Sequence, residues 1–124
     1  MEDKKRLPDS ELELMNIIWE IEAPCTRSDI EKHLTCGREL APSTIITFLT
    51  RLTNKGFLQV SHMGRTNYYS PLVSRNEYLA KENRSFIDRL YGGSISAFAV
   101  SLTSGGISED ELNELRRLLR EDKL

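Results

Sequence analysis

The sequence lacks the features of a membrane or secreted protein. No run among its 124 residues approaches the roughly 18 apolar residues that a transmembrane helix needs. Residues 1–6 are charged and are not followed by an apolar segment, so the start of the chain does not resemble a signal peptide. We therefore expect a cytoplasmic protein that does not associate with a membrane. Its length suits one domain of ordinary size, or a small domain with an appendage.

Cysteine is scarce, with only Cys25 and Cys36 in the chain. Two thiols fit a reducing compartment, and if a helix runs between them their Cα atoms lie ~16 Å apart, too far for a disulfide. Together with His33 they could supply three of the four ligands of a zinc ion, but the same helix would spread the two thiols apart. We predict no disulfide, no metal site and no cofactor.

The motifs of common enzyme classes are missing as well. There is no glycine loop of the kind that binds phosphate, no H-E-x-x-H metal motif, and no serine or cysteine in a recognisable nucleophile setting. The abundant carboxylates lie where they would cap helices or face solvent, which explains them without catalysis. We therefore predict a protein that is not an enzyme and has no catalytic residues.

A net positive charge is also absent, since the formal net charge is −2, whereas nucleic-acid-binding domains are often basic overall. The charges are unevenly distributed, however. Residues 1–37 contain five basic and nine acidic side chains, residues 38–71 contain four and one, and residues 72–124 contain eight and nine. Only the middle section is basic, which favours an anionic partner that binds locally.

Residues 42–57 are the stretch around which the rest of the chain is organised. Pro42 suits the first turn of a helix and Gly56 is placed to end it, so we predict a helix over residues 42–55. At about 100° per residue, one face of this helix is apolar and is predicted to face a core. The residues of that face are Ile45, Phe48, Leu49 and Leu52.

The opposite face of this helix is rich in hydroxyl groups. Solvated faces usually carry Glu and Lys, because Thr and Asn each lower helix stability by roughly 0.5 kcal/mol. Short hydrogen-bonding groups flanked by cations, with no acid between Glu39 and Glu77, suit a helix in a DNA major groove. The alternative is a Thr-rich surface that is merely tolerated. The candidate DNA contacts on this helix are Ser43, Thr44, Ile46, Thr47, Thr50, Arg51 and Lys55.

Two predicted helices precede the hydroxyl-rich helix. Ser10 with Glu13 forms a capping-box pattern for a helix over residues 10–22, which is apolar on more than half of its surface and needs packing partners on two sides. Thr26 with Asp29 starts a shorter helix, and a turn then leads into the hydroxyl-rich helix. Helix, turn and helix in close succession predict a helix-turn-helix whose second helix contacts DNA.

The spacing of apolar residues changes from a helical to an alternating pattern after the hydroxyl-rich helix. Residues 58–62 alternate between apolar and polar, Gly64 marks a turn, and residues 67–70 contain strand-favouring aromatics. This pattern predicts a β-hairpin, and a hairpin directly after a DNA-contacting helix is the arrangement called a winged helix. We predict that this wing, residues 61–68, lies at the DNA backbone. Its candidate contacts are His62 and Arg65.

Three further helices are predicted, one capped by Ser74 with Glu77, one over residues 94–103, and one capped by Ser108 with Glu111. About 45 residues with narrow apolar stripes cannot form a stable core alone, so we expect a symmetric homodimer. The alternative is that these helices fold back on the first domain. The residues predicted to form the dimer interface are Phe86, Ile87, Leu90, Ile95, Phe98, Leu102, Leu112, Leu115, Leu118 and Leu119.

The predicted fold is therefore mainly α with a small β-hairpin wing. We predict a winged helix-turn-helix DNA-binding domain over residues 1–73 and a three-helix dimerisation region over residues 74–124.

Four segments of the chain resemble the penicillinase-repressor (BlaI/MecI-type) family of transcriptional regulators. The block P-x-T-I-x-T-x-L-x-R-L-x-x-K-G followed by G-R-x-x-x-Y-x-P is far more specific than a general helix-turn-helix pattern. The matching segments are residues 10–19, 42–57, 64–71 and 107–119. The resemblance implies a winged-helix domain, a helical dimerisation region, and repression of transcription through palindromic operators. It also implies DNA contact at Thr44, Thr47, Arg51, Lys55 and Arg65.

Two regulatory routes of this family bear on the partners. In antibiotic-responsive members, a membrane sensor leads to a cut between Asn and Phe in the dimerisation region, so the resemblance suggests a sensor-linked protease as a partner. The nearest counterpart here is Ser101-Leu102, which aligns only with a one-residue gap, and we do not transfer the cleavage site. The copper-responsive branch has paired C-x-C motifs near the C-terminus, and this sequence contains none.

We therefore predict a sequence-specific DNA-binding transcriptional repressor. It would bind a palindromic double-stranded DNA operator as a homodimer, with helix 42–55 in the major groove and the 61–68 wing at the backbone. Relatives often carry a basic residue at the positions of Ser43 and Ile46, so the resemblance does not carry over the operator sequence. The alternative function is a winged-helix protein–protein adaptor without specific DNA binding.

Overall fold

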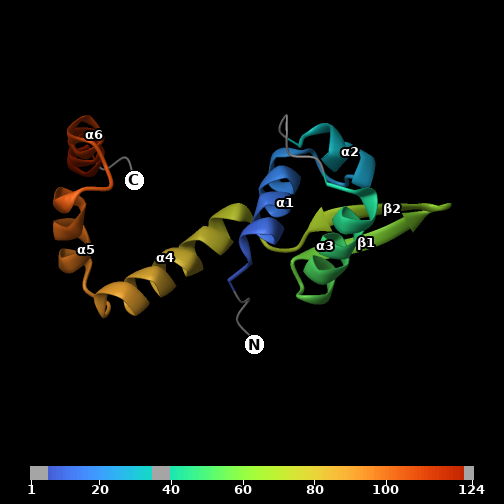
Figure 1. The fold of residues 1–124 in the computed structure, drawn as a ribbon, viewed down its shortest axis with the longest axis horizontal. Coiled ribbons are helices and arrows are strands. Elements are labelled where there is room, and N and C mark those ends of the chain that lie inside the picture. The colour runs from blue at the N-terminus through green and yellow to red at the C-terminus, as the bar shows by residue number, and fades with distance from the viewer. Residues whose placement is uncertain (1–5, 35–39, 122–124) are drawn as a thin grey trace. The chain divides into compact units, whose positions relative to one another are not determined.

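The computed structural model describes residues 6–34 and 40–121, and the chain divides into two compact units, Met1–Leu79 and Ala80–Leu124. Figure 1 shows the helices and strands of both units. Over the described residues the fold is mainly helical with one antiparallel hairpin, which confirms the predicted fold class. The elements of the first unit are α1 (Asp9–Glu20), α2 (Arg27–Lys32), α3 (Pro42–Asn54), β1 (Leu58–Met63) and β2 (Thr66–Pro71).

The start of α1 differs from the prediction. The helix begins at Asp9 after Pro8, which has the extended backbone angles φ −57° and ψ 153°, and no side chain caps it. Ser10 therefore lies inside the first turn rather than before it, and the expected capping box with Glu13 was wrong. Acidic side chains in this first turn, Asp9 and Glu11, lie at the positive end of the helix dipole.

The capping box of α2 is confirmed. The Thr26 side chain accepts a hydrogen bond from the Asp29 amide, and the Asp29 carboxylate accepts one from the Thr26 amide at 2.9 Å. That backbone hydrogen bond, supported by the Thr26 hydroxyl, holds the pKa of Asp29 below its ordinary value. The cap fixes where α2 starts, and it therefore fixes how α2 approaches α3 in the helix-turn-helix.

The helix α3 has the ends that the sequence predicted. Pro42 occupies its first turn, and Gly56 closes it with φ 86°, a left-handed conformation that glycine adopts without strain. The Phe57 amide then donates to the Leu52 carbonyl at 2.9 Å, which satisfies one of the last carbonyls of the helix. Phe57 is fully buried, so this turn delivers the chain directly from α3 into the first strand through the core.

Strands β1 and β2 form the predicted hairpin, with Met63 paired to Thr66 at its end. Gly64 has φ 65° at the first position of the two-residue turn, as the tight turns of hairpins require. Cys25 adds an antiparallel bridge to Tyr69 through two backbone hydrogen bonds of 2.9 and 2.8 Å. The bridge ties the segment before α2 to the base of the hairpin, so hairpin and helix-turn-helix share one framework.

A single core holds the first unit together. Within it α1 contacts α2, α3 and β2, so its wide apolar surface is covered from more than one side, as predicted. The Trp19 indole donates to the Val73 carbonyl at 2.9 Å, and the Leu7 amide donates to the Tyr78 hydroxyl at 2.9 Å. The Tyr78 ring also lies 5.8 Å from that of Trp19 and 5.7 Å from that of Phe57, measured between centroids. Other fully buried members are Leu14, Met15, Ile18, Ile30, Ile45, Leu49, Leu52 and Leu58.

The first turn of α4 (Arg75–Tyr91) belongs to this core. Ser74 and Glu77 form the predicted capping box at the start of the helix, through hydrogen bonds of 3.3 and 3.1 Å. Tyr78 is only 5% exposed and Leu79 packs against the core. The first compact unit consequently ends at Leu79 within α4, whereas the sequence predicts a domain boundary at residue 73.

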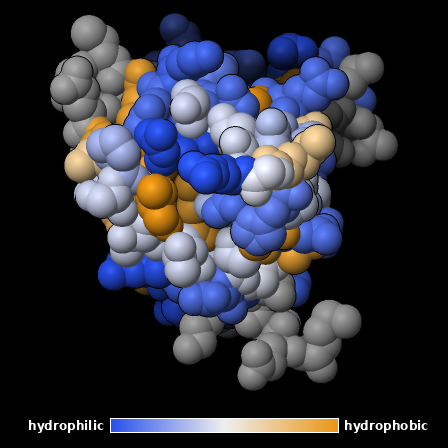
Figure 2. Space-filling view, turned by 90° about the vertical axis from the view of Figure 1, so that its right-hand side faces the viewer, coloured by the Kyte–Doolittle hydropathy of each residue, from blue (hydrophilic) through white to orange (hydrophobic). Residues whose placement is uncertain are grey.

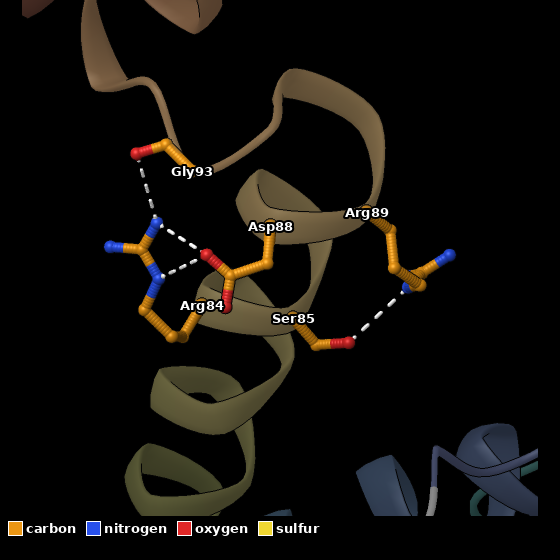
Figure 3. A network of polar contacts seen from close by, with 5 residues as sticks. All are labelled: Arg84, Ser85, Asp88, Arg89 and Gly93. Atoms are coloured by element: carbon orange, nitrogen blue, oxygen red, sulfur yellow. Dashed lines mark hydrogen bonds and ion pairs between the residues drawn. The ribbon is translucent and has the colours of Figure 1, made fainter.

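The second unit begins within α4, and a polar network marks the end of that helix (Figure 3). The Arg84 guanidinium donates to the Asp88 carboxylate at 2.8 and 3.1 Å and to the Gly93 carbonyl at 3.4 Å. Gly92 and Gly93 have φ 57° and 83°, so the chain leaves the helix through a left-handed turn. Arg84 thus clamps the turn after α4 from within the helix.

The remaining elements are α5 (Ile95–Ser101), a 3₁₀ turn (Leu102–Ser104) and α6 (Glu109–Arg120). The single helix expected over residues 94–103 therefore changes to 3₁₀ geometry in its last turn. The predicted Ser108–Glu111 capping box of α6 is confirmed. The rings of Phe86, Tyr91 and Phe98 lie 5.5 to 6.2 Å apart, which joins α4 to α5.

Candidate nucleic-acid interface

The apolar face of α3 is buried as its spacing predicted, and this orients the opposite face outward. Ile45, Leu49 and Leu52 are fully buried, while Phe48 is half-buried. Thr44, one of the candidate contacts, is half-buried at the edge of the two faces. The residues that α3 exposes are Pro42, Ser43, Ile46, Thr47, Thr50, Arg51 and Asn54. The exposed face of α3 therefore carries no acid and one cation.

The hydroxyl of Thr47 is partly committed within α3. Its Oγ1 donates to the Ser43 carbonyl at 2.9 Å, four residues back. Because a hydroxyl has one proton and two lone pairs, the Thr47 oxygen remains able to accept a hydrogen bond from a ligand. Thr47 thus offers an acceptor and a methyl group on the exposed face.

Arg51 is exposed, and its guanidinium carbon lies 6.0 Å from the centre of the Phe48 ring. Contact between a cation and an aromatic face is favourable, and it restrains a long side chain. Arg51 makes no ion pair with any other residue that the structure describes. A restrained guanidinium without a carboxylate partner suits contact with a phosphate or a guanine edge.

Lys55 has a partner inside the protein that sequence reasoning missed. Its Nζ lies 2.6 Å from Oε1 of Glu11, whose side chain is only 4% exposed, whereas the Lys55 side chain is 37% exposed. The pair links the end of α3 to α1. A carboxylate buried this far needs a compensating charge, and Lys55 supplies it. Lys55 therefore has a structural function, and its predicted contact with DNA stays a prediction.

Replacing Lys55 with Met should lower the free energy of unfolding by about 1–3 kcal/mol, because Glu11 is left buried without its partner. Methionine keeps most of the aliphatic length of lysine, so the loss is electrostatic. Urea unfolding followed by circular dichroism measures the change. The double variant Glu11→Gln with Lys55→Met should recover part of the loss, and equal stability of wild type and Lys55→Met would contradict the assigned function.

The hairpin carries the two predicted wing contacts. Arg65 is exposed in the turn and has no ion pair with another described residue. His62 is exposed and faces Asn67 across the strands, where its Nδ1 donates to Oδ1 of Asn67 at 2.5 Å. Met63 is 69% exposed beside the turn and was not among the predicted contacts.

A hollow of about 300 Å³ lies between α2, α3 and the hairpin. It brings Arg65 and Ile46, two predicted contacts far apart in the sequence, to one concave surface. The other lining residues are Thr26, Arg27, Ser28, Thr66, Asn67 and Tyr69. Sequence reasoning missed the contribution of α2, because its capping residues signal only a helix start and their approach to the hairpin depends on the bridge at Cys25.

The residues considered as zinc ligands have other environments. Cys25 is fully buried, and burial raises the pKa of its thiol. His33 is exposed, with its Nδ1 2.9 Å from the Asp29 carbonyl, and Cys36 lies outside the described residues. In residues 6–34 and 40–121, no three His, Cys, Asp or Glu side chains are grouped as metal ligands.

Across those same ranges, none of the helices has the length and apolarity to cross a membrane.

The predicted dimer residues lie in the second unit at three levels of exposure. Ile87 is buried, whereas Phe86, Leu90, Ile95 and Leu119 are exposed by 37 to 59%. Phe98, Leu102, Leu112, Leu115 and Leu118 are half-buried. Val100 is 66% exposed and was not in the predicted set, because it falls off the helical stripe from which that set was chosen.

Ser101 and Leu102, the nearest counterpart of the family's cleavage site, lie where α5 meets the 3₁₀ turn, and both are half-buried. The Ser101 hydroxyl donates to the Phe98 carbonyl at 2.6 Å and lies 3.0 Å from the Tyr91 hydroxyl. A protease needs an extended substrate backbone, so cleavage here would require this helix end to unfold locally.

Comparison with known proteins identifies relatives of the whole chain. The family model of the penicillinase repressors matches residues 7–121. The penicillinase repressor of Bacillus licheniformis is 32% identical over 123 residues, which cover 96% of this chain and 95% of the relative. The methicillin resistance regulatory protein MecI of Mammaliicoccus sciuri is 30% identical over 114 residues, which cover 91% and 92% of the two chains.

Solved structures match nearly two thirds of this chain. The solution structure of the DNA-binding domain of the repressor BlaI aligns with a TM-score of 0.53 at 32% identity, and covers 63% of this chain and 94% of that domain. The monomeric form of Bacillus licheniformis BlaI in complex with the blaP half-operator aligns with a TM-score of 0.50 at the same identity and coverage. The match over residues 7–121, the full-length relatives and the shared winged helix show that this chain belongs to the penicillinase repressor family.

Proposed function

We propose that this protein represses transcription by binding a palindromic operator as a homodimer, with α3 in the major groove and the hairpin at the DNA backbone. It belongs to a family of repressors rather than enzymes. A relative of the same fold has been solved in complex with an operator half-site, which supports duplex DNA as the partner of this chain. The exposed face of α3 is the observation that supports the proposal most strongly.

The charge and chemistry of that face suit DNA. Ser43, Thr47 and Thr50 offer short hydroxyl groups, and Arg51 adds a guanidinium held against Phe48. Hydroxyl and guanidinium groups are the side chains that reach base edges and phosphates in the major groove. The exposed guanidinium of Arg65 on the hairpin would contact the phosphate backbone beside the groove that α3 occupies.

The exposed apolar residues of the second unit support the homodimer. Leu90, Ile95, Val100 and Leu119 are each at least 58% exposed in the single chain. Large apolar side chains exposed on so small a unit favour association, and a second copy with two-fold symmetry offers the same surface in return. Two copies would present two α3 helices, which a palindromic operator matches.

A winged-helix adaptor that contacts proteins instead of DNA is the competing function. Arg51 separates the two, because its substitution should affect DNA binding only if α3 enters the groove. The variant Arg51→Ala should lower operator affinity by ~1–3 kcal/mol if the guanidinium contacts a base. If it contacts a phosphate instead, the slope of log affinity against log salt should fall by about one unit.

Fluorescence anisotropy with a labelled operator duplex, at several salt concentrations, measures both quantities. Arg75→Ala is the matched control, because Arg75 is also an exposed arginine of the first unit but lies outside α3 and the hairpin. We expect the control to bind as wild type does. Equal binding by Arg51→Ala at every salt concentration would favour the adaptor.

A further inference from the structure

Ile46 stands out on the exposed face of α3. Apart from Pro42 at the start of the helix, it is the only aliphatic side chain that this face exposes, and 47% of its surface is accessible. Isoleucine gains nothing for the helix there, since branching at Cβ lowers helix propensity. The side chain is neither part of the core nor needed for the helix, so its exposed surface requires another explanation.

Most of the neighbours of Ile46 on this surface are polar. Ser43, Thr47 and Thr50 lie beside it on the same helix face. It also lines the hollow of about 300 Å³, whose walls include the Arg65 guanidinium and the Asn67 amide. Figure 2 shows this side of the molecule as mostly hydrophilic, with several separate hydrophobic areas.

One aliphatic side chain within a polar surface is too small an area for docking of a protein. Stable protein–protein contacts bury about 800 Å² per partner, with a continuous apolar centre. It suits a ligand that is polar overall and has single methyl groups at fixed positions. In duplex DNA, the thymine C5-methyl is the one aliphatic group that a base presents in the major groove.

We propose that Ile46 is a specificity-determining residue that recognises the methyl group of one thymine in each operator half-site. This inference rests on the proposed function and deepens it, because it names a base that the operator must contain. The polar groups around Ile46 would hold the sugar–phosphate backbone and neighbouring base edges, which fixes the register of the helix. The apolar contact then discriminates thymine from cytosine, which lacks the methyl group.

The test replaces thymine by deoxyuridine, which removes only the methyl group and keeps base pairing. Each thymine of the operator half-site, first identified by selection from a random pool, is replaced in turn, and binding is measured by anisotropy at ~150 mM salt. We expect one position at which the replacement weakens wild-type binding ~4-fold, the effect of exposing one buried methyl group.

The variant Ile46→Ala should lose this discrimination, so that its affinities for the thymine and deoxyuridine duplexes become equal at that position. Ile46→Val keeps a branched apolar side chain and should retain it. Leu72→Ala is the control for loss of exposed apolar surface elsewhere, since Leu72 is 55% exposed and lies outside α3. Circular dichroism should show all three variants folded, because neither residue belongs to the core.

Two results would overturn the inference alone. One is tight binding by wild type with no thymine whose methyl group matters, and the other is an unchanged thymine preference in Ile46→Ala. If wild type bound no duplex above the non-specific level, the proposed function itself would fail, and the inference with it. These outcomes of the experiment therefore distinguish a wrong base assignment from a wrong function.

Discussion

Replacing both Leu115 and Leu118 with Asp is expected to weaken operator binding by about 10²- to 10⁴-fold, the usual range for the loss of bivalent attachment. Both side chains are half-buried on α6, beside the exposed Leu119. In the proposed dimer the two substitutions would bring four carboxylates into one apolar contact, and their desolvation prevents association. Each chain would then bind a half-site alone.

The first unit should survive this change intact. Its core is built from residues between Leu7 and Leu79, and no member comes from α6. Analytical ultracentrifugation should therefore give a monomer for the double variant, while anisotropy still detects weak half-site binding. Asn113→Asp is the control, because it adds a carboxylate at an exposed position of the same helix and should leave the dimer intact. A monomeric double variant with full operator affinity would contradict the importance assigned to the second unit.

Inserting five base pairs between the operator half-sites is expected to weaken binding by a similar factor, about 10²- to 10⁴-fold. Two α3 helices in one dimer should be separated by one helical turn of DNA, ~10 base pairs, or by a multiple of it. Half a turn of extra DNA places the two half-sites on opposite faces of the duplex, so that one dimer engages only one of them.

An insertion of ten base pairs is the matched control, since it returns both half-sites to the same side of the duplex and changes only the distance between them. Recovery of part of the affinity would support a fixed relative orientation of the two winged domains in the dimer. Equal binding to the original and the five-base-pair operator would show that the winged domains are flexibly tethered, or that a single chain suffices.

The first unit shows how much local sequence patterns predict. The ends of α3 follow from Pro42 and Gly56, and its buried face follows from helical spacing. The hairpin follows from alternation around Gly64. These features depend on residues close together in the chain, so their signals are present in short windows of sequence. The capping boxes at Thr26, Ser74 and Ser108 belong to the same class.

Features that depend on tertiary approach were not predicted. The ion pair between Glu11 and Lys55 joins residues 44 positions apart, and nothing in either local pattern indicates it. The concave surface that joins Ile46 to Arg65 depends on where α2 and the hairpin lie, which the Cys25–Tyr69 bridge sets. The prediction of a cap at Ser10 was wrong for a local reason, because α1 starts earlier, directly after the extended Pro8.

Selection of bound fragments from a random duplex DNA pool, followed by sequencing, tests the central claim most directly. Selection at ~150 mM salt suppresses non-specific attraction to phosphates, so enrichment reports base recognition. Our account predicts a two-fold symmetric motif whose half-sites are centred one helical turn, or a multiple of it, apart. A pool without enrichment would contradict the assignment of this protein as a sequence-specific repressor.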